Sequence, residues 1–413
     1  MSASSELKPR KLVIVGGSSP NTPAFFEAAH GDRWDEVCLV GRSAEKLERV
    51  GQTCTAVVEK RELHVRITWD TDLARAARDA TCVLNMLRVG GAAAVAEDRL
   101  LLAASGIVGH AASYPEAIRH LPPTLLAAHT VQSVAPGAAF VNFANPVSIL
   151  CEAIANETAL TCFGICHHAF SMRTDFARIL DSPPSDVRVE YRGLNHLGWV
   201  TDVLVNGASA LDELIRRLVQ RRLKAYDYDL APEFRAIPIK HAGALYHKGE
   251  VLYVRQAGPR SSAVDVVLRS ALGGGPLRTW LDRRAARAEE TARGGWYARC
   301  IVPFLDALYD GSAQEFVMTW RHGGAVSQVP GQTAETTAVL HSGHVEPAAL
   351  GSDLPEATQE WLRQVRTSER LLLRSVKERS DALLVESLAI HPGVASVGHA
   401  RDFVRRLRPF AHD

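Results

Sequence analysis

Long hydrophobic runs are absent from this sequence of 413 residues. Nowhere do the roughly 18 consecutive apolar residues of a membrane-spanning helix occur, and residues 1–11 are polar, unlike a secretory signal. Net charge is nearly absent too, because 47 basic residues balance 46 acidic ones to +1, so no overall field attracts nucleic acid or an anionic membrane. We therefore expect a cytoplasmic protein without membrane or nucleic-acid partners.

Cysteine is scarce. Seven residues are scattered along the chain, an odd number with no CxxC pair. In a reducing cytosol this pattern favours buried thiols over a disulfide framework. The hydrophobic and charged fractions, 46% and 23%, are typical of an ordinary globular protein, and a chain of this length suits two domains better than one core.

Short apolar segments alternate with helical ones over the first part of the chain. Residues 11–15 (KLVIV) predict a strand buried on both faces of a parallel sheet, with a helix beginning near Thr22 and Pro23. Further strands are predicted at 37–40, 65–69, 82–86, 139–143 and 161–166, with helices at 44–61, 72–80, 97–105 and 120–134. This order predicts the α/β class, with a Rossmann domain, a doubly wound parallel sheet, over residues 1–168.

Residues 169–413 are predicted to form a second domain of mixed α+β structure, mostly helical, as in the lactate and malate dehydrogenases. Residues 187–193 begin an antiparallel sheet, and helical periodicity covers 208–222, 277–294, 296–309 and 355–390. No low-complexity linker separates the domains, so we expect an extensive interface with a crevice. The substrate, metal and oligomer contacts are expected in this second domain.

The turn Gly16-Gly17-Ser18-Ser19 directly follows the first predicted strand. Glycines there allow the backbone to approach a pyrophosphate, and the N–H groups of the next helix favour the anion. The strict GxGxxG pattern is absent, so the place of the turn at the start of a βαβ series carries the prediction of a dinucleotide site. An ordinary tight turn is the alternative.

The second predicted strand is followed by Gly41-Arg42-Ser43. NAD-preferring folds usually place an acidic residue here for the ribose hydroxyls, whereas an arginine accommodates a 2′-phosphate. NAD is the predicted cofactor, with NADP as the alternative. A solvent-exposed loop arginine is the other interpretation of Arg42.

Further short motifs follow the predicted strands in order. They are Arg88-Val89-Gly90-Gly91, Asn142-Phe143-Ala144-Asn145-Pro146, Gly164-Ile165-Cys166, Gly193-Leu194-Asn195-His196 and Arg293-Gly294-Gly295. With the turn at Gly16 they resemble the family 4 glycoside hydrolases, which are NAD- and divalent-metal-dependent α- and β-glycosidases and 6-phospho-glycosidases, an exception to two-carboxylate chemistry. The resemblance covers nearly the whole chain.

In that family a cysteine and a histidine bind Mn²⁺ or a similar ion, and the matching residues here are Cys166 and His196. A thiolate and an imidazole with open positions suit a metal that acts as a Lewis acid on substrate oxygens. A buried strand thiol is the alternative for Cys166. His167 and His168 come next, and strand alternation would send them to opposite faces, so we expect one of them, His167, to contact substrate.

The resemblance also implies a mechanism. The nicotinamide takes a hydride from a sugar carbon, a base removes the acidified neighbouring proton, and elimination, water addition and return of the hydride follow. Asn145, Arg88 and Arg293 are expected to contact the substrate, and Asn142 the cofactor. A turn asparagine and a surface arginine are the alternatives for Asn145 and Arg88.

Two segments depart from the family pattern. Residues 110–115 replace a longer glycine-rich loop that touches the sugar or its phosphate, which puts recognition of a 6-phosphate in question. The family base is a tyrosine in a tyrosine-rich segment after an Ile-Pro pair. After Ile237-Pro238 this chain offers Tyr246 and His241, our predicted catalytic residues, with His247 and Lys240 as alternatives. A packing tyrosine is the other interpretation of Tyr246.

The predicted function is an NAD(P)- and Mn-dependent glycosidase-like hydrolase acting on a carbohydrate-like small molecule. An oxidoreductase, epimerase or lyase acting on a sugar, cyclitol or nucleoside-like substrate is the alternative, favoured by the two departures. A non-catalytic NAD(P) sensor would be expected to lose the Cys166–His196 pair. The resemblance alone implies a homodimer or homotetramer.

Overall fold

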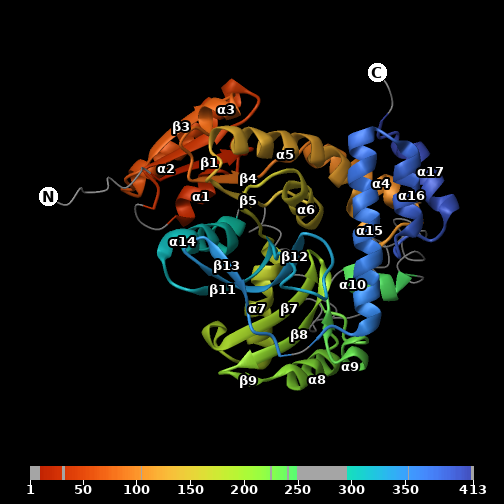
Figure 1. Ribbon diagram of the computed structural model, residues 1–413. Coiled ribbons are helices and arrows are strands. Elements are labelled where there is room, and N and C mark those ends of the chain that lie inside the picture. Colours follow the sequence, from red (N-terminus) through yellow and green to blue (C-terminus); the bar gives the residue numbers. More distant parts are fainter. Residues whose placement is uncertain are drawn as a thin grey trace, which may run out of the picture.

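The computed structural model describes residues 10–29, 33–103, 105–223, 226–239, 241–248, 295–351 and 353–410. The N-terminal part, red to yellow in Figure 1, is a parallel sheet covered by helices. Its strands lie in the order β6, β5, β4, β1, β2, β3. They are β1 (Lys11–Val15), β2 (Glu36–Val40), β3 (Arg66–Asp70), β4 (Cys82–Asn85), β5 (Ala139–Asn142) and β6 (Cys162–Gly164). The apolar central strands are buried on both faces, so the Rossmann prediction is confirmed.

Helices connect these strands in the predicted order. They are α1 (Pro23–Ala28), α2 (Ala44–Lys60), α3 (Leu73–Ala76), α4 (Gly91–Ala103), α5 (Tyr114–Val134) and α6 (Val147–Glu157), with the short 3₁₀ helix η1 (Gly109–Ser113) before α5. Helix α2 begins after Ser43, whose hydroxyl accepts the N–H of Lys46. Helix α5 begins before the predicted residue 120, because Pro115 fits the first turn of a helix.

Antiparallel strands extend the same sheet in the second half of the chain. They are β7 (Val187–Leu194), β8 (Leu197–Val205), β9 (Ala208–Ser209), β10 (Ile237–Pro238), β11 (Gln314–Arg321), β12 (Thr333–His341) and β13 (His344–Pro347). β11 and β12 were not predicted. In β12, threonine, alanine and one glutamate occupy buried positions on both faces, so no apolar alternation marks the strand.

One pair of strands joins the two halves. β11 runs antiparallel to β6, with Thr319 opposite Gly164 and Trp320 opposite Phe163. β12 pairs in turn with β7, and the result is a single sheet in which the described residues contribute thirteen strands. The carboxyl end of β6 therefore lies inside a continuous sheet.

Helices surround this extended sheet. They are α7 (His167–Leu180), η2 (Pro184–Asp186), α8 (Leu211–Arg221), α9 (Ala231–Phe234), α10 (His241–Tyr246), the π-helical turn η3 (Tyr297–Ile301), α14 (Val302–Asp310), α15 (Glu356–Glu378), α16 (Asp381–Ile390) and α17 (Val397–Leu407). The long helix predicted over 355–390 is two helices, because Arg379 is left-handed and Ser380 caps α16. The helix predicted at 277–294 lies outside the described residues. Among those described, none has the length and apolar character that crossing a membrane requires.

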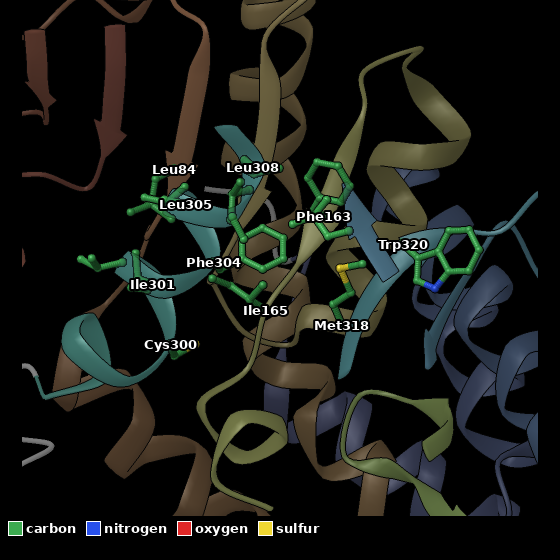
Figure 2. Packing of buried hydrophobic residues seen from close by; sticks show 14 of the residues in the cluster. Leu84, Phe163, Ile165, Cys300, Ile301, Phe304, Leu305, Leu308, Met318 and Trp320 are labelled. Atoms are coloured by element: carbon green, nitrogen blue, oxygen red, sulfur yellow. The ribbon is translucent and has the colours of Figure 1, made fainter. Parts of the chain in front are cut away.

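The central core joins elements of both halves. Figure 2 shows Leu84 of β4 and Phe163 of β6 beside Phe304 of α14 and Met318 of β11. The rings of Phe163 and Phe304 lie 5.7 Å apart, edge to face. All seven cysteines are buried free thiols, as predicted.

Candidate active site

The turn after β1 lies against the end of β2. The N–H groups of Gly16 and Gly17 both donate to the carbonyl of Val40 at 2.9 Å. Gly16 has a φ of 91°, and a Cβ there would lie 2.8 Å from the carbonyl oxygen of Met86. A Cβ on Gly17 would lie 2.9 Å from Leu39. Only glycine fits at these places, and the bare backbone that results allows close approach of a pyrophosphate.

Ser18, Ser19 and Arg42 border this turn. A Cβ on Gly41 would lie 2.9 Å from the hydroxyl oxygen of Ser18, so Ser18 packs directly against the chain that leaves β2. Both serines are half-buried, and Arg42 is exposed. These residues, which were predicted to contact the dinucleotide, therefore lie together at the carboxyl ends of β1 and β2. Their contact with the dinucleotide stays a prediction.

Asn142 occupies the end of β5 beside Asn85 at the end of β4. Both side chains are fully buried, and Asn85 Nδ2 donates to Asn142 Oδ1 at 2.8 Å. Asn142 Nδ2 donates to the carbonyl of Ala144 at 3.0 Å. This amide thus shapes the turn after β5, and a contact between Asn142 and the cofactor stays a prediction.

A histidine that the sequence did not single out links Arg88 and Asn145. The buried ring of His120 accepts the N–H of Val89 at 2.9 Å through Nε2, and its Nδ1 faces the carbonyl of Asn145. Nδ1 must donate to that carbonyl, so the ring is neutral with its proton on Nδ1. His120 thereby holds together the two segments whose exposed side chains, Arg88 and Asn145, were predicted to bind substrate.

The structure brings Cys166 and His196 together across thirty positions of sequence. Cys166 Sγ lies 3.1 Å from His196 Nε2. Cys166 follows β6 and precedes α7, and His196 lies in the two-residue turn between β7 and β8. Within the described part of the chain, no group of three or more His, Cys, Asp or Glu side chains is arranged to hold a metal. A two-ligand site would leave the other positions of the ion open.

The backbone of His196 is in an uncommon conformation. Its φ is 63°, in the left-handed region that residues other than glycine seldom adopt. The turn is held by Asn195, whose Nδ2 donates to Glu335 Oε1 at 2.7 Å, and both of these side chains are buried. Burial first, and then the charge of Glu335, raise the pKa of the neighbouring Tyr191 well above its ordinary value. Ten described residues other than glycine have a positive φ, so this conformation reflects the tight two-residue turn that presents His196.

The strand-alternation argument for His167 and His168 is wrong. The chain leaves β6 at Gly164 and is helical from His167 onward, so the two rings are not on opposite faces of a strand. The ring of His168 lies 6.0 Å from that of His196, centroid to centroid. His168 therefore lies beside His196 of the candidate metal pair, and a substrate contact of His167 stays a prediction.

The two predicted catalytic side chains on α10 have different surroundings. His241 donates its backbone N–H to the carbonyl of His196 at 2.9 Å, and the two rings lie 5.5 Å apart, edge to face. The ring of Tyr246 instead packs on Phe234 and on Trp361 of α15, at 4.9 and 4.3 Å. Burial raises the pKa of Tyr246. His241 is therefore the candidate that the structure brings to the Cys166–His196 pair.

Behind His241 lies a buried group of charges that the sequence analysis missed. The rings of His110 and His241 are 6.1 Å apart, and Nε2 of His110 lies 3.1 Å from Oε1 of Glu369, in ion-pair contact without hydrogen-bond alignment. Arg366 Nη1 donates to Glu369 Oε2 at 2.5 Å. Burial raises the pKa of Glu369, but Arg366 and then His110 outweigh it and bring the pKa to about 2.

This charge group was visible in the sequence in one respect. Arg366 and Glu369 stand among Leu362, Val365 and Leu372, on the buried stripe of α15. Two charges on an apolar stripe usually pair with each other. Arg293, predicted to contact substrate, lies outside the described residues.

Comparison with known proteins places these features in a family. The family model described as "Family 4 glycosyl hydrolase" matches residues 11–182, and that of the "Family 4 glycosyl hydrolase C-terminal domain" matches residues 191–394. A probable 6-phospho-beta-glucosidase of Bacillus subtilis is 24% identical over 416 residues, covering 94% of this chain and 92% of the relative. An alpha-galactosidase of Rhizobium meliloti is 30% identical over 217 residues, covering 50% and 44%.

Solved structures share the fold. The 6-phospho-beta glucosidase of Thermotoga maritima, with manganese, NAD+ and glucose-6-phosphate, superposes with a TM-score of 0.77 at 19% identity, covering 96% of this chain and 97% of that chain. A malate dehydrogenase of Plasmodium falciparum gives a TM-score of 0.53 at 11% identity, covering 89% and 99%. The likeness to a dehydrogenase fold, predicted from the sequence, is confirmed.

Proposed function

Because the chain belongs to the family 4 glycosyl hydrolases, we propose that it cleaves a glycosidic bond of a small carbohydrate with the help of a nicotinamide dinucleotide and a divalent metal ion. The observation that carries the proposal is the 3.1 Å contact of Cys166 with His196, formed by two distant turns. A thiol and an imidazole form a metal-ligand pair, whereas a glycosidase of the common kind needs two carboxylates.

The residues present fit both groups. The bare backbone at Gly16 and Gly17 suits a pyrophosphate, and Cys166 and His196 suit an ion that keeps open positions for substrate oxygens. When bound, the dinucleotide supplies reversible hydride acceptance and the metal ion polarises a substrate oxygen.

The side chains around the pair divide the remaining tasks. His241 lies beside His196, so its ring is placed to remove a proton from a substrate carbon held at the pair. Arg88 and Asn145 present exposed side chains from the two segments that His120 links, and they bind substrate hydroxyls or an anionic group. Contacts of His167 and Arg293 with substrate and of Asn142 with the cofactor stay predictions. The division into two domains between residues 168 and 169 and the homodimer or homotetramer stay predictions as well.

The segment after Gly109 bears on the substrate. It forms η1, and its His110 is buried against Glu369. This segment therefore packs behind His241, because the rings of His110 and His241 lie 6.1 Å apart. The resemblance implies that family members have a longer loop here, which contacts the sugar or its phosphate. The relatives include proteins named as 6-phospho-beta-glucosidases and one named as an alpha-galactosidase, so glycosides with and without a 6-phosphate both belong in the test.

The test is the redox balance of turnover. Enzyme, Mn²⁺ and a small amount of NAD or NADP are incubated with p-nitrophenyl glycosides, each with and without a 6-phosphate. Release of nitrophenol is followed together with the absorbance of reduced nicotinamide. We expect many moles of nitrophenol per mole of cofactor without accumulation of the reduced form. Reduced cofactor in proportion to product would show an oxidoreductase, and conversion of the sugar without cleavage an epimerase.

A further inference from the structure

The end of β2 is the place where a Rossmann fold distinguishes NAD from NADP. An acidic side chain there binds the ribose hydroxyls of NAD, and an arginine accommodates the 2′-phosphate of NADP. In this chain Val40 ends β2 and accepts the N–H groups of Gly16 and Gly17, so the residues after it adjoin the dinucleotide turn. Those residues are Gly41, Arg42 and Ser43.

None of the three residues that directly follow β2 carries a carboxylate. Position 41 is crowded, because a Cβ there would lie 2.9 Å from Ser18 Oγ, so a side chain at this position would require Ser18 to shift. Asp70, opposite Val40 at the end of β3, receives two hydrogen bonds of 2.6 Å from Arg75. The bonds from Arg75 lower the pKa of Asp70. The negative charge of Asp70 is therefore already balanced by Arg75.

The neighbouring carboxylate is also engaged. Asp72 accepts the N–H groups of Ala74 and Arg75 as the cap of α3. Asp70 and Asp72 therefore each have partners of their own, and the first acidic residue after β2 along the chain, Glu45, lies in the first turn of α2.

Cationic and hydroxyl donors take the place of the acid. Arg42 is exposed and forms no hydrogen bond or ion pair with any residue that the structure describes. Ser43 accepts the N–H of Lys46 at 3.3 Å, and its own hydroxyl proton remains to be donated. A guanidinium and a hydroxyl side by side are suited to a phosphate monoester.

We propose that this enzyme binds NADP in preference to NAD, with Arg42 and Ser43 holding the 2′-phosphate. The proposal rests on the dinucleotide site of the proposed function and specifies which dinucleotide that site takes. Charge-assisted bonds to a phosphate are worth about tenfold or more in affinity.

Binding of each dinucleotide to the full chain tests this, by calorimetry in the absence of substrate. We expect the dissociation constant of NADP to be lower than that of NAD by about tenfold or more. R42A should raise the constant for NADP by a similar factor and that for NAD by less than about threefold. R49A is the matched control and should change neither constant, because Arg49 is an exposed arginine of α2, the helix that follows Arg42.

Equal or tighter binding of NAD by the unmodified enzyme would overturn the proposal, as would an R42A variant in which both constants rise by the same factor. Either result leaves the glycosidase function standing if turnover with NAD is observed. Failure to bind both dinucleotides would overturn the proposed function together with the preference.

Discussion

Cys166 Sγ and His196 Nε2 lie 3.1 Å apart, although the two residues come from turns at the ends of different strands. Cys166 is positioned by β6 of the parallel sheet, and His196 by the β7–β8 hairpin. Their meeting depends on the long-range pairing of the sheet and not on any local motif.

Replacing either member of the pair should remove metal binding. C166S and H196A are each expected to weaken Mn²⁺ binding by at least about tenfold, because each removes one of the two ligands that we propose. Calorimetric titration with Mn²⁺ measures the effect. C162A is the control, since Cys162 is buried on β6, the strand that precedes Cys166, and its thiol lies 3.9 Å from that of Cys151. An unchanged affinity in C166S would show that the thiol is structural.

The base should be His241. H241N is expected to lower kcat by about 10²- to 10⁴-fold with little change in dinucleotide affinity, because it removes the proton acceptor beside His196. Y246F should retain activity within about threefold, since the Tyr246 ring packs on Trp361 and its hydroxyl is buried. Steady-state kinetics of both variants decide the assignment. The opposite pattern would return the role to Tyr246.

Two ion pairs on α15 differ in burial but not in spacing. Glu369 and Arg366 are buried, whereas Glu360 and Arg363 are about half exposed, and both pairs are three residues apart. E369Q is expected to lower the free energy of unfolding by about 3 kcal/mol, because it leaves Arg366 with the more distant carboxylate of Glu152, at 3.5 Å, in place of a 2.5 Å ion pair. E360Q should change it by less than about 0.5 kcal/mol. Urea unfolding measures both, and similar losses would contradict this account of the network.

Stability should fall as the pH drops below 6.5. Burial, and then the charge of His110, hold the pKa of His391 well below its ordinary value of 6.5. The charges of His241 and Lys248 also lower this pKa, whereas that of Glu369 raises it. The unfolded chain therefore binds a proton below pH 6.5 that the folded chain excludes, and stability is lost as the pH falls. Glu369 adds a separate loss below its ordinary pKa of 4.5.

The measurement is the melting temperature between pH 8 and pH 5. The variant H391N is the control. In the unmodified protein Nδ1 of His391 accepts the N–H of Gly393 at 2.9 Å, and in H391N the amide oxygen of the asparagine can accept it instead, but this side chain does not titrate. The dependence between pH 6.5 and 5 should be weaker in H391N than in the unmodified protein. Identical slopes would mean that His391 does not exclude a proton.

The glycine turn offers a last test. G16A should weaken dinucleotide binding and lower stability by about 1–3 kcal/mol, because φ is positive and a Cβ would lie 2.8 Å from the Met86 carbonyl oxygen. G137A is the control, since a Cβ there meets nothing within 4 Å. Binding and thermal unfolding are measured together. A harmless G16A would show that the turn can rearrange.

The sequence predicted the parallel sheet well because its central strands are continuous apolar runs. It did not predict β12, where Thr336 is buried against Trp320 of β11 and Glu335 against Asn195 of the β7–β8 turn. The metal pair came from a family resemblance, since no spacing rule connects Cys166 with His196. The error over His168 arose because the end of β6 could not be located to the residue.

The contact between His110 and Glu369 had no local signal at all. The two residues are 259 positions apart, and they meet only because the fold brings α15 next to η1. Long-range charge pairs of this kind are settled by tertiary packing, whereas periodicity reports only local faces.

The pairing of β11 with β6 means that neither half of the chain has a finished sheet on its own. Cut near residue 182, the parallel half would present the backbone N–H and C=O groups of β6 at an open edge, which invites association with other strands. The second half would lose the partner of β11 in the same way. The two matched family segments therefore share one sheet, and exchange of either segment alone would change the partner of an edge strand in the other.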